Sequence, residues 1–224
     1  MRGDSTKKKI AIVFTGDAFA EGAGSILTTL QNTHTKASFF LTGRFYRNKA
    51  FEKTITALKK AGHYLGPHSN AHLLYCDWNK RDNLLVTKDQ FTSDLLENYA
   101  SMGRFGIPKP EASYFLPPYE WYNDSIAHWT HDLGLRLINY SPGTISHADY
   151  TVPSDKNYRT SDEIFQSIIQ YEMGHKEGLN GFILLMHIGA GQQRSDKFYE
   201  RLPQLIAWLK RKGYAFERID KLLR

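Results

Sequence analysis

Short apolar runs rich in β-branched and aromatic residues alternate along the chain with segments of helical periodicity. The runs lie at 10–14, 37–42, 63–67, 113–118, 135–140, 181–187 and 214–219. Between them, apolar residues spaced three and four positions apart predict helices over 25–33, 51–63, 89–106, 124–134, 161–175 and 198–213. Several of these segments close on glycine, which is common at helix ends.

Repeated alternation of strand and helix predicts parallel strands joined by helical crossovers. We therefore expect an α/β fold, an incomplete (distorted) β/α barrel of about seven parallel strands with outer helices. The 224 residues contain no evident linker, repeat or low-complexity tract. We expect one barrel domain over 10–224, preceded by a disordered or tag-like segment over 1–9.

Composition and charge exclude several classes of function. The 29 basic and 23 acidic residues give a net charge of +6, but the longest basic run is "KKK" at 7–9. This scatter indicates a solvated surface and argues against a nucleic-acid partner. No apolar run approaches the ~20 residues of a membrane span. A single cysteine, Cys76, cannot form an internal disulfide.

The compartment and the oligomeric state remain open at this point. The opening "MRGDSTKKK" is charged and has no apolar stretch, so the sequence as written contains no signal peptide. We expect a periplasmic or extracellular protein if such a peptide was removed, and a cytoplasmic one otherwise.

Polar residues suited to chemistry follow the predicted strands. In β/α barrels active sites lie where the strands end, at their carboxyl edge. The residues expected at that edge are Asp17, His68, His72, Tyr119, Glu120 and His187. The polar segment 141–160 is interpreted as an elaborated loop over the same site.

His68 and His72 form an H-x-x-x-H pair, which on a helical turn would place both rings on one side. Two neutral imidazoles and one carboxylate are a common catalytic set for zinc. Two surface histidines at this spacing also occur by chance, so the pair alone leaves both interpretations open. A zinc-protease H-E-x-x-H motif is disfavoured because Ser69 occupies the glutamate position.

The order of several short motifs carries more information than any one of them. "VFTGDAFAEG", "SFFLTG", "HSNAH", "FLPPYEW" and "LLMH" follow one another between Ile10 and Leu223. Together they resemble the polysaccharide deacetylases of carbohydrate esterase family four. The resemblance implies an incomplete β/α barrel that removes acetyl groups from sugars with a divalent metal, often zinc.

The resemblance also implies roles for individual residues. The family's T-F-D-D-G matches 14–18, and its H-S/T-x-x-H matches 68–72, so the implied metal ligands are Asp17, His68 and His72. Its L-x-H matches 185–187, which makes His187 the general acid.

The family's R-P-P-Y-G matches 116–120. There the tyrosine backbone N–H binds the developing oxyanion, a role that Tyr119 keeps whatever its side chain. Pro118 and Trp121 are expected to lie beside it at the substrate.

Two family residues are missing from this chain. The base aspartate is matched by Gly16, and its arginine partner by Leu116. Loss of both together avoids an unpaired buried charge, which would cost several kcal/mol, and indicates a re-engineered site. Asp149, in "SHADY", is the candidate for the aspartate that orients His187.

Three alternatives remain for the base. Glu120 stands where the family has glycine and is the first candidate; it could equally be a solvent-facing residue capping the helix predicted at 124–134. Glu21 is the reserve. A zinc-bound water can also ionise without a strong base, since its pKa falls to about 7.

The sequence therefore predicts a metal-dependent hydrolase removing N- or O-acetyl groups from a polysaccharide or oligosaccharide, with an acetylated glycan as its partner. The alternative is a catalytically impaired glycan-binding protein that retains the metal. A glycoside hydrolase is a weaker rival, because it needs two carboxylates at roughly 5–9.5 Å. Aromatic residues after two strands are suited to stacking on sugars or to core packing: Tyr75, Trp78, Tyr119, Trp121 and Tyr122.

Overall fold

The structure, a computed structural model, describes residues 1–224 and contains a strand at each of the seven predicted runs. The strands are β1 (Lys9–Gly16), β2 (Ser38–Leu41), β3 (Tyr64–Pro67), β4 (Tyr114–Phe115), β5 (Arg136–Leu137), β6 (Phe182–His187) and β7 (Ala215–Phe216). All strand pairs are parallel. This confirms the predicted α/β class with a parallel sheet.

The strands form a distorted barrel made of two sheets. The larger has the order β3-β2-β1-β6, with β7 beside the start of β1, and the smaller pairs β4 with β5. The backbone hydrogen bonds between them are isolated: Leu116 N–H donates to the Pro67 carbonyl at 3.4 Å, and Ser141 N–H to the Ile183 carbonyl at 3.0 Å. The ring therefore closes through isolated bonds, which explains its distortion.

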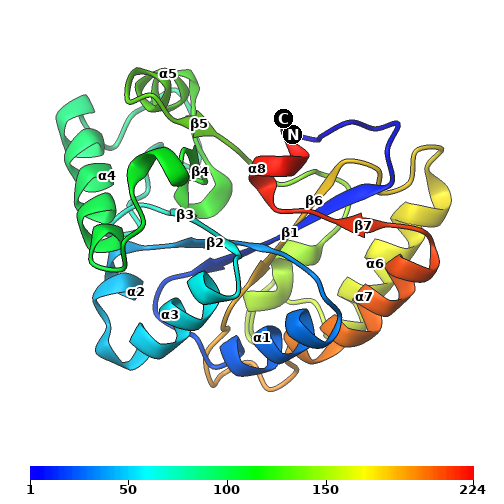
Figure 1. Ribbon diagram of the computed structural model, residues 1–224. Coiled ribbons are helices and arrows are strands. Elements are labelled where there is room, and N and C mark those ends of the chain that lie inside the picture. The colour runs from blue at the N-terminus through cyan, green and yellow to red at the C-terminus, as the bar shows by residue number, and fades with distance from the viewer.

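The six predicted helices are present and lie around the outside of the strands (Figure 1). They are α1 (Ala23–Asn32), α3 (Glu52–Lys60), α4 (Lys88–Gly103), α5 (Asp124–Asp132), α6 (Ser161–Gly174) and α7 (Leu202–Arg211). Capping boxes, Thr87 with Gln90 and Thr160 with Glu163, start α4 and α6. None of the helices is long and apolar enough to cross a membrane.

Two short α-helices were not predicted. α2 (Gly43–Arg47) follows β2 directly, and the Thr42 side chain accepts a hydrogen bond from Phe45 N–H to start it. α8 (Ile219–Leu222) lies near the chain end, and Ile219 and Leu222 pack against the inner side of the barrel. Both are too short to show a helical period.

The core has two layers because β1 is buried on both faces. Ile10, Ile12 and Phe14 belong to a 32-residue cluster shared with the outer helices. Ala11 and Val13 belong to an 11-residue cluster inside the barrel. The inside is thus filled with side chains, as expected for a barrel that holds its chemistry at one rim.

The segment before Lys9 has no helix or strand, but its first residues contact the body of the fold. Arg2 donates to the carbonyls of Asn180 at 2.5 Å and Gly178 at 2.7 Å. The two ends of the chain lie side by side (Figure 1), with Gly3 close to Leu222.

The long connection 141–160 is fixed by a buried arginine. The Arg194 side chain is fully buried and donates to the carbonyls of Thr151 at 2.7 Å, Arg159 at 3.0 Å and Asp196 at 2.6 Å. Because buried guanidinium groups need such acceptors, Arg194 ties the second half of the loop, at Thr151 and Arg159, to the segment that follows β6.

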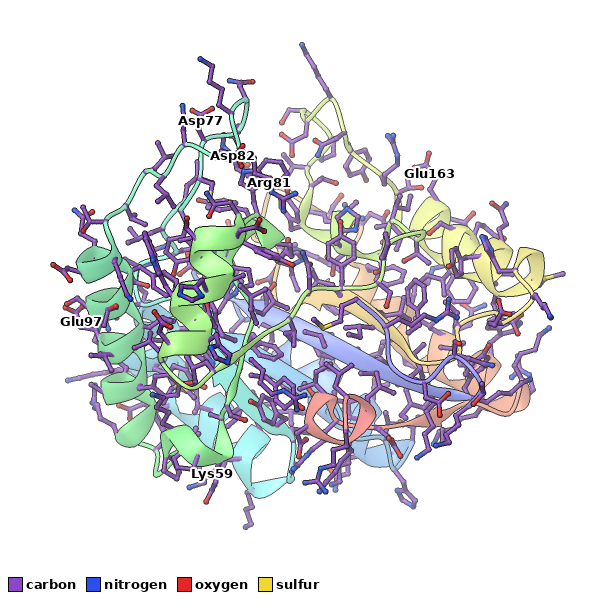
Figure 2. All side chains as sticks on the ribbon, turned by 90° about the horizontal axis from the view of Figure 1, so that it is seen from above. Lys59, Asp77, Arg81, Asp82, Glu97 and Glu163 are labelled. Atoms are coloured by element: carbon purple, nitrogen blue, oxygen red, sulfur yellow. The ribbon has the colours of Figure 1, made fainter.

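A second loop, between β3 and α4, is held by Arg81. Its guanidinium lies 4.2 Å from the Trp121 ring centroid, and its Nε donates to the Tyr122 carbonyl at 2.6 Å. Figure 2 shows Arg81 together with Asp77 and Asp82 in this loop, and Lys59 at the opposite end of the molecule.

Candidate active site

A cavity of about 490 Å³ opens at the carboxyl edge of the strands. Six of the predicted site residues line it: Asp17, His68, His72, Tyr119, Glu120 and His187. Pro118 and Trp121 do not line it; Pro118 is buried and Trp121 packs against Arg81. The structure therefore brings together residues from four separate strand ends.

His68 is presented in a single tautomer. Its Nδ1 donates to the Leu116 carbonyl at 2.7 Å, and its backbone N–H donates to the Asn98 side chain at 2.9 Å. A proton on Nδ1 leaves the Nε2 lone pair free. Burial, and then the neighbouring His72, keeps the pKa of His68 well below its usual value. The ring is therefore neutral at pH 7, which is the metal-binding form.

His72 meets His68 through a turn, and the helical turn we expected here is wrong. No helix covers 68–72, and His72 has a φ of 55°. Asp94, on α4, accepts hydrogen bonds from the Asn70 and Ala71 backbone N–H groups, both at 3.0 Å, which holds the turn. The two imidazole centroids lie 5.1 Å apart, and burial lowers the pKa of His72.

Asp17 lines the same cavity but is engaged by an arginine. Arg44 Nε donates to Oδ1 at 3.0 Å and Nη2 to Oδ2 at 2.6 Å. Thr42 also donates to Oδ1, at 2.8 Å. No three histidine, cysteine or carboxylate side chains stand in an arrangement that could hold a metal ion. The two histidines fit such a group, and the carboxylate fits it only once released from Arg44.

His187 has a buried carboxylate partner. Its Nδ1 donates to Asp149 Oδ1 at 2.6 Å, and its backbone N–H donates to Oδ2 at 2.9 Å. Burial opposes the charged imidazole, but the charge and hydrogen bond of Asp149, and then Glu120, raise the pKa of His187. Asp149 is the residue of "SHADY" that the sequence offered as candidate, and the structure places it where an orienting carboxylate is needed.

Glu120 lies in the cavity at an unusual backbone conformation. Tyr119 and Glu120 have φ of 59° and 53°, a left-handed region that costs a residue other than glycine about 1 kcal/mol or more. Burial raises the pKa of Glu120 to about 7. The helix-capping alternative is wrong, because Asn123 caps α5 by accepting from Ile126 N–H.

Glu21, the reserve candidate for the base, forms its hydrogen bonds outside the cavity. Its carboxylate accepts hydrogen bonds from Ala190 and Gly191 N–H at 2.7 and 2.8 Å and from Lys197 Nζ at 2.9 Å. These bonds hold the loop that follows β6, and Glu21 does not line the cavity.

The position of the family's base is closed by apolar atoms. A Cβ added at Gly16 would lie 2.7 Å from Ile188 Cγ2, 2.8 Å from Leu41 Cδ2 and 3.1 Å from Phe45 Cε2. Leu116 is fully buried in the inner core cluster. The loss of both charged groups is therefore accompanied by repacking of the space between β1 and its neighbours.

Four exposed aromatic side chains line the cavity: Phe19, Trp78, Tyr119 and Tyr150. Trp78 and Tyr119 are 52% and 44% exposed, with ring centroids 5.4 Å apart. Tyr75, by contrast, is fully buried. Of the aromatic residues predicted to stack on sugars or pack in the core, Trp78 and Tyr119 line the cavity with exposed rings. Tyr75 packs in the core, and the Trp121 ring is covered by Arg81.

The loop 141–160 contributes directly to the cavity. His147, Tyr150 and Asn157 line it, which confirms the expectation that this segment lies over the site. None of the three was identified from the sequence, because a polar loop carries no periodicity that would indicate which side chains turn inward.

Another cavity, of about 530 Å³, lies at the amino ends of β3, β4 and β5. Its lining includes five lysine and arginine side chains: Lys59, Arg136, Arg218, Lys221 and Arg224. It contains neither the histidine pair nor Glu120, and Lys59 lies at the end of the molecule opposite Asp77 (Figure 2).

Comparison with known proteins is consistent with this geometry. The sequence model of a family described as "Polysaccharide deacetylase" matches residues 2–138. A peptidoglycan-N-acetylglucosamine deacetylase of Bacillus cereus is 27% identical over 221 residues, covering 98% of this chain and 90% of the relative. The peptidoglycan-N-acetylmuramic acid deacetylase PdaA of Bacillus subtilis is 24% identical over 225 residues, covering 99% and 73%.

Solved structures show the same fold. The Bc1960 peptidoglycan N-acetylglucosamine deacetylase has a TM-score of 0.78 at 19% identity, covering 100% of this chain and 91% of that one. A CE4 family pseudoenzyme of Bacillus anthracis has a TM-score of 0.75 at 23% identity, covering 100% and 68%. A mutant of that pseudoenzyme is described as having restored enzymatic activity.

Proposed function

We propose, on the premise that this chain belongs to the polysaccharide deacetylase family, that it hydrolyses an N- or O-acetyl group on a polysaccharide or oligosaccharide. One observation carries the proposal. A single cavity of about 490 Å³ holds Glu120, the His68–His72 pair and His187, and His187 is bonded to buried Asp149.

A divalent metal, zinc first, is part of this proposal. Two neutral imidazoles and a carboxylate are a suitable donor set, with His68, His72 and Asp17 as the residues that would hold it. The Nδ1–H bond of His68 to Leu116 supports this, because it leaves Nε2 free. When bound, the metal would polarise the acetyl carbonyl and lower the pKa of water.

Glu120 is proposed as the base that takes a proton from the attacking water. With a pKa of about 7, its carboxylate is substantially ionised at neutral pH and still basic enough to accept a proton. The water oxygen then forms the new bond to the acetyl carbon. Tyr119 would place its backbone N–H at the developing oxyanion.

His187 is proposed as the acid. With Nδ1 bonded to Asp149, the protonated ring holds its second proton on Nε2. As the carbon–nitrogen or carbon–oxygen bond to the sugar breaks, Nε2 gives this proton to the departing group. The products are acetate and a free amine or hydroxyl.

The exposed faces of Trp78 and Tyr119 support a glycan as the substrate. Sugar rings pack their C–H faces on aromatic side chains, and these two lie at the cavity mouth. We assign the stacking role to this pair, because the ring face of Trp121 is covered by the Arg81 guanidinium.

A second candidate is a glycan-binding protein of this fold that has lost turnover. It is favoured by the filled space at Gly16 and by the similarity to a pseudoenzyme structure. The two candidates differ in chemistry: the first releases acetate, and the second retains glycan without releasing it.

The test is acetate release by zinc-supplemented protein from acetylated chitooligosaccharides, peptidoglycan fragments and acetylated xylan, with His68→Ala beside it. Release that disappears in the variant supports the hydrolase. Glycan retention without acetate supports the binding protein. New reducing ends in place of acetate would show a glycosidase and contradict both.

A further inference from the structure

Arg44 is placed beside Asp17 by backbone contacts with the histidine turn. The Gly43 N–H donates to the Ser69 carbonyl and the Arg44 N–H to the Asn70 carbonyl, both at 3.1 Å. The start of α2 is thus anchored to the same turn that carries His68 and His72. These bonds fix the Arg44 backbone beside the site, and the side-chain rotamer brings the guanidinium to Asp17.

The Arg44 guanidinium engages both oxygens of Asp17, at 3.0 and 2.6 Å. Paired parallel bonds of this kind are the strongest arrangement available to arginine and a carboxylate. Thr42 adds a third bond to Oδ1. Both oxygens of the Asp17 carboxylate are therefore engaged by hydrogen-bond donors other than the histidine pair.

We propose that Arg44 is an internal competitor for the metal and determines how tightly this site holds a divalent cation. This inference rests on the metal site of the proposed function. A metal ion at Asp17 competes with the guanidinium for this carboxylate, because two cations on one carboxylate repel each other.

The exposure of the pair makes this displacement feasible. The Arg44 side chain is 53% exposed and that of Asp17 is 25% exposed. Ion pairs at such positions are weak and screened by salt. Arg44 can therefore turn into water, and its competition lowers the metal affinity moderately without abolishing it.

The experiment titrates zinc alone, without substrate, against a competing chromophoric chelator. Arg44→Gln removes the charge, and Arg104→Gln, at an exposed arginine that ends α4, removes one elsewhere. We expect R44Q to bind zinc up to about fivefold more tightly than the wild type, with R104Q unchanged. The difference in zinc affinity between R44Q and the wild type should decrease at high salt. Equal affinities for R44Q and R104Q would overturn the proposal.

A double-mutant cycle locates the effect. In an Asp17→Asn background the guanidinium has no carboxylate to occupy, so adding Arg44→Gln should no longer tighten zinc binding. If the gain persists in that background, Arg44 acts through long-range charge alone and the competition is disproved. Thermal unfolding of each variant establishes that the compared proteins are folded.

The outcomes separate this inference from the proposed function. R44Q that binds zinc more tightly but releases no acetate supports the competition and contradicts the hydrolase. Acetate release by a wild type whose zinc affinity equals that of R44Q supports the hydrolase and contradicts the competition.

Discussion

His187 Nδ1 donates a hydrogen bond to Asp149 Oδ1 across 2.6 Å, and the His187 backbone N–H donates to Oδ2 across 2.9 Å. One carboxylate thereby fixes both the ring and the end of β6. The polar loop presents this carboxylate to the strand from 38 positions away in the sequence. In the proposed reaction, Asp149 positions the acid and stabilises its charge.

Asp149→Asn should weaken the acid function of His187. Without the carboxylate charge, the burial of the ring dominates and the pKa of His187 falls. We expect the alkaline limb of the kcat/KM profile to move to lower pH and the rate at neutral pH to fall by about 10²-fold. Asp155→Asn, on the same loop, serves as the control. An unmoved alkaline limb would contradict the assignment.

Glu120→Gln should remove the base. The carboxamide cannot accept the proton, so acetate release should fall by about 10²-fold or more while glycan binding is retained. In the wild type, kcat/KM should rise as pH increases through about 7, because the carboxylate is the active form. Glu52→Gln, on the exposed side of α3, is the matched control. Full acetate release by E120Q would eliminate Glu120 as base.

The same substitution should stabilise the fold at alkaline pH. Burial raises the pKa of Glu120 from an ordinary 4.5 to about 7, so its favourable contribution is complete below pH 4.5 and is lost as pH rises through 7. His187 and Asp149 act on this group with opposite signs. E120Q lacks the ionisation and should therefore exceed the wild type in unfolding free energy at pH 8 but match it near pH 4. Urea denaturation at both pH values measures this difference.

The central strands could be predicted because they are short runs buried on both faces, as β1 shows with Ile10 to Phe14 fully buried. The two-residue strands β5 and β7 are partly exposed, and they were predicted from the apolar runs around them. The α2 helix could not be predicted, since five residues hold no measurable period. Because α2 was not predicted, one residue of the site was also missed. Arg44, which engages Asp17, lies on α2 and was not identified from the sequence.

For the histidine pair, too, the sequence predicted only part of the geometry, and tertiary contacts determine the rest. The spacing indicated that both rings would meet, and their centroids lie 5.1 Å apart. The helical turn was wrong because Asp94, from a distant helix, satisfies the backbone of a turn that periodicity cannot indicate. Asp94 lies on the buried face of the predicted helix 89–106, and a buried aspartate there was the available signal.

Gly16→Asp, which restores the family's base, should fail in this chain. The new Cβ would meet Ile188 and Leu41 at 2.7 and 2.8 Å, and the charge would have no arginine because Leu116 is in its place. We expect a loss of about 3 kcal/mol in unfolding free energy and no gain in acetate release.

Gly24→Asp is the control for this substitution, because nothing lies within 4 Å of a Cβ at Gly24. It should change stability by only about 0.5 kcal/mol. A stable and more active G16D would show that the apolar packing around Gly16 does not exclude the family's base.

Trp78→Ala should weaken substrate binding with little effect on stability. The Trp78 side chain is 52% exposed and lies beside Tyr119 at the cavity mouth, so its loss removes a stacking face but few core contacts. We expect KM for an acetylated oligosaccharide to rise about three- to tenfold with kcat nearly unchanged.

Trp121→Ala should behave in the opposite way, although the two rings lie only 5.7 Å apart. The Trp121 indole donates to the Asp77 carbonyl at 3.2 Å and packs under Arg81, so its removal releases the loop between β3 and α4. We expect a loss of about 2 kcal/mol in unfolding free energy. Measured KM and melting temperature for both variants distinguish the roles. A W78A protein with unchanged KM would place the glycan on another side of the cavity.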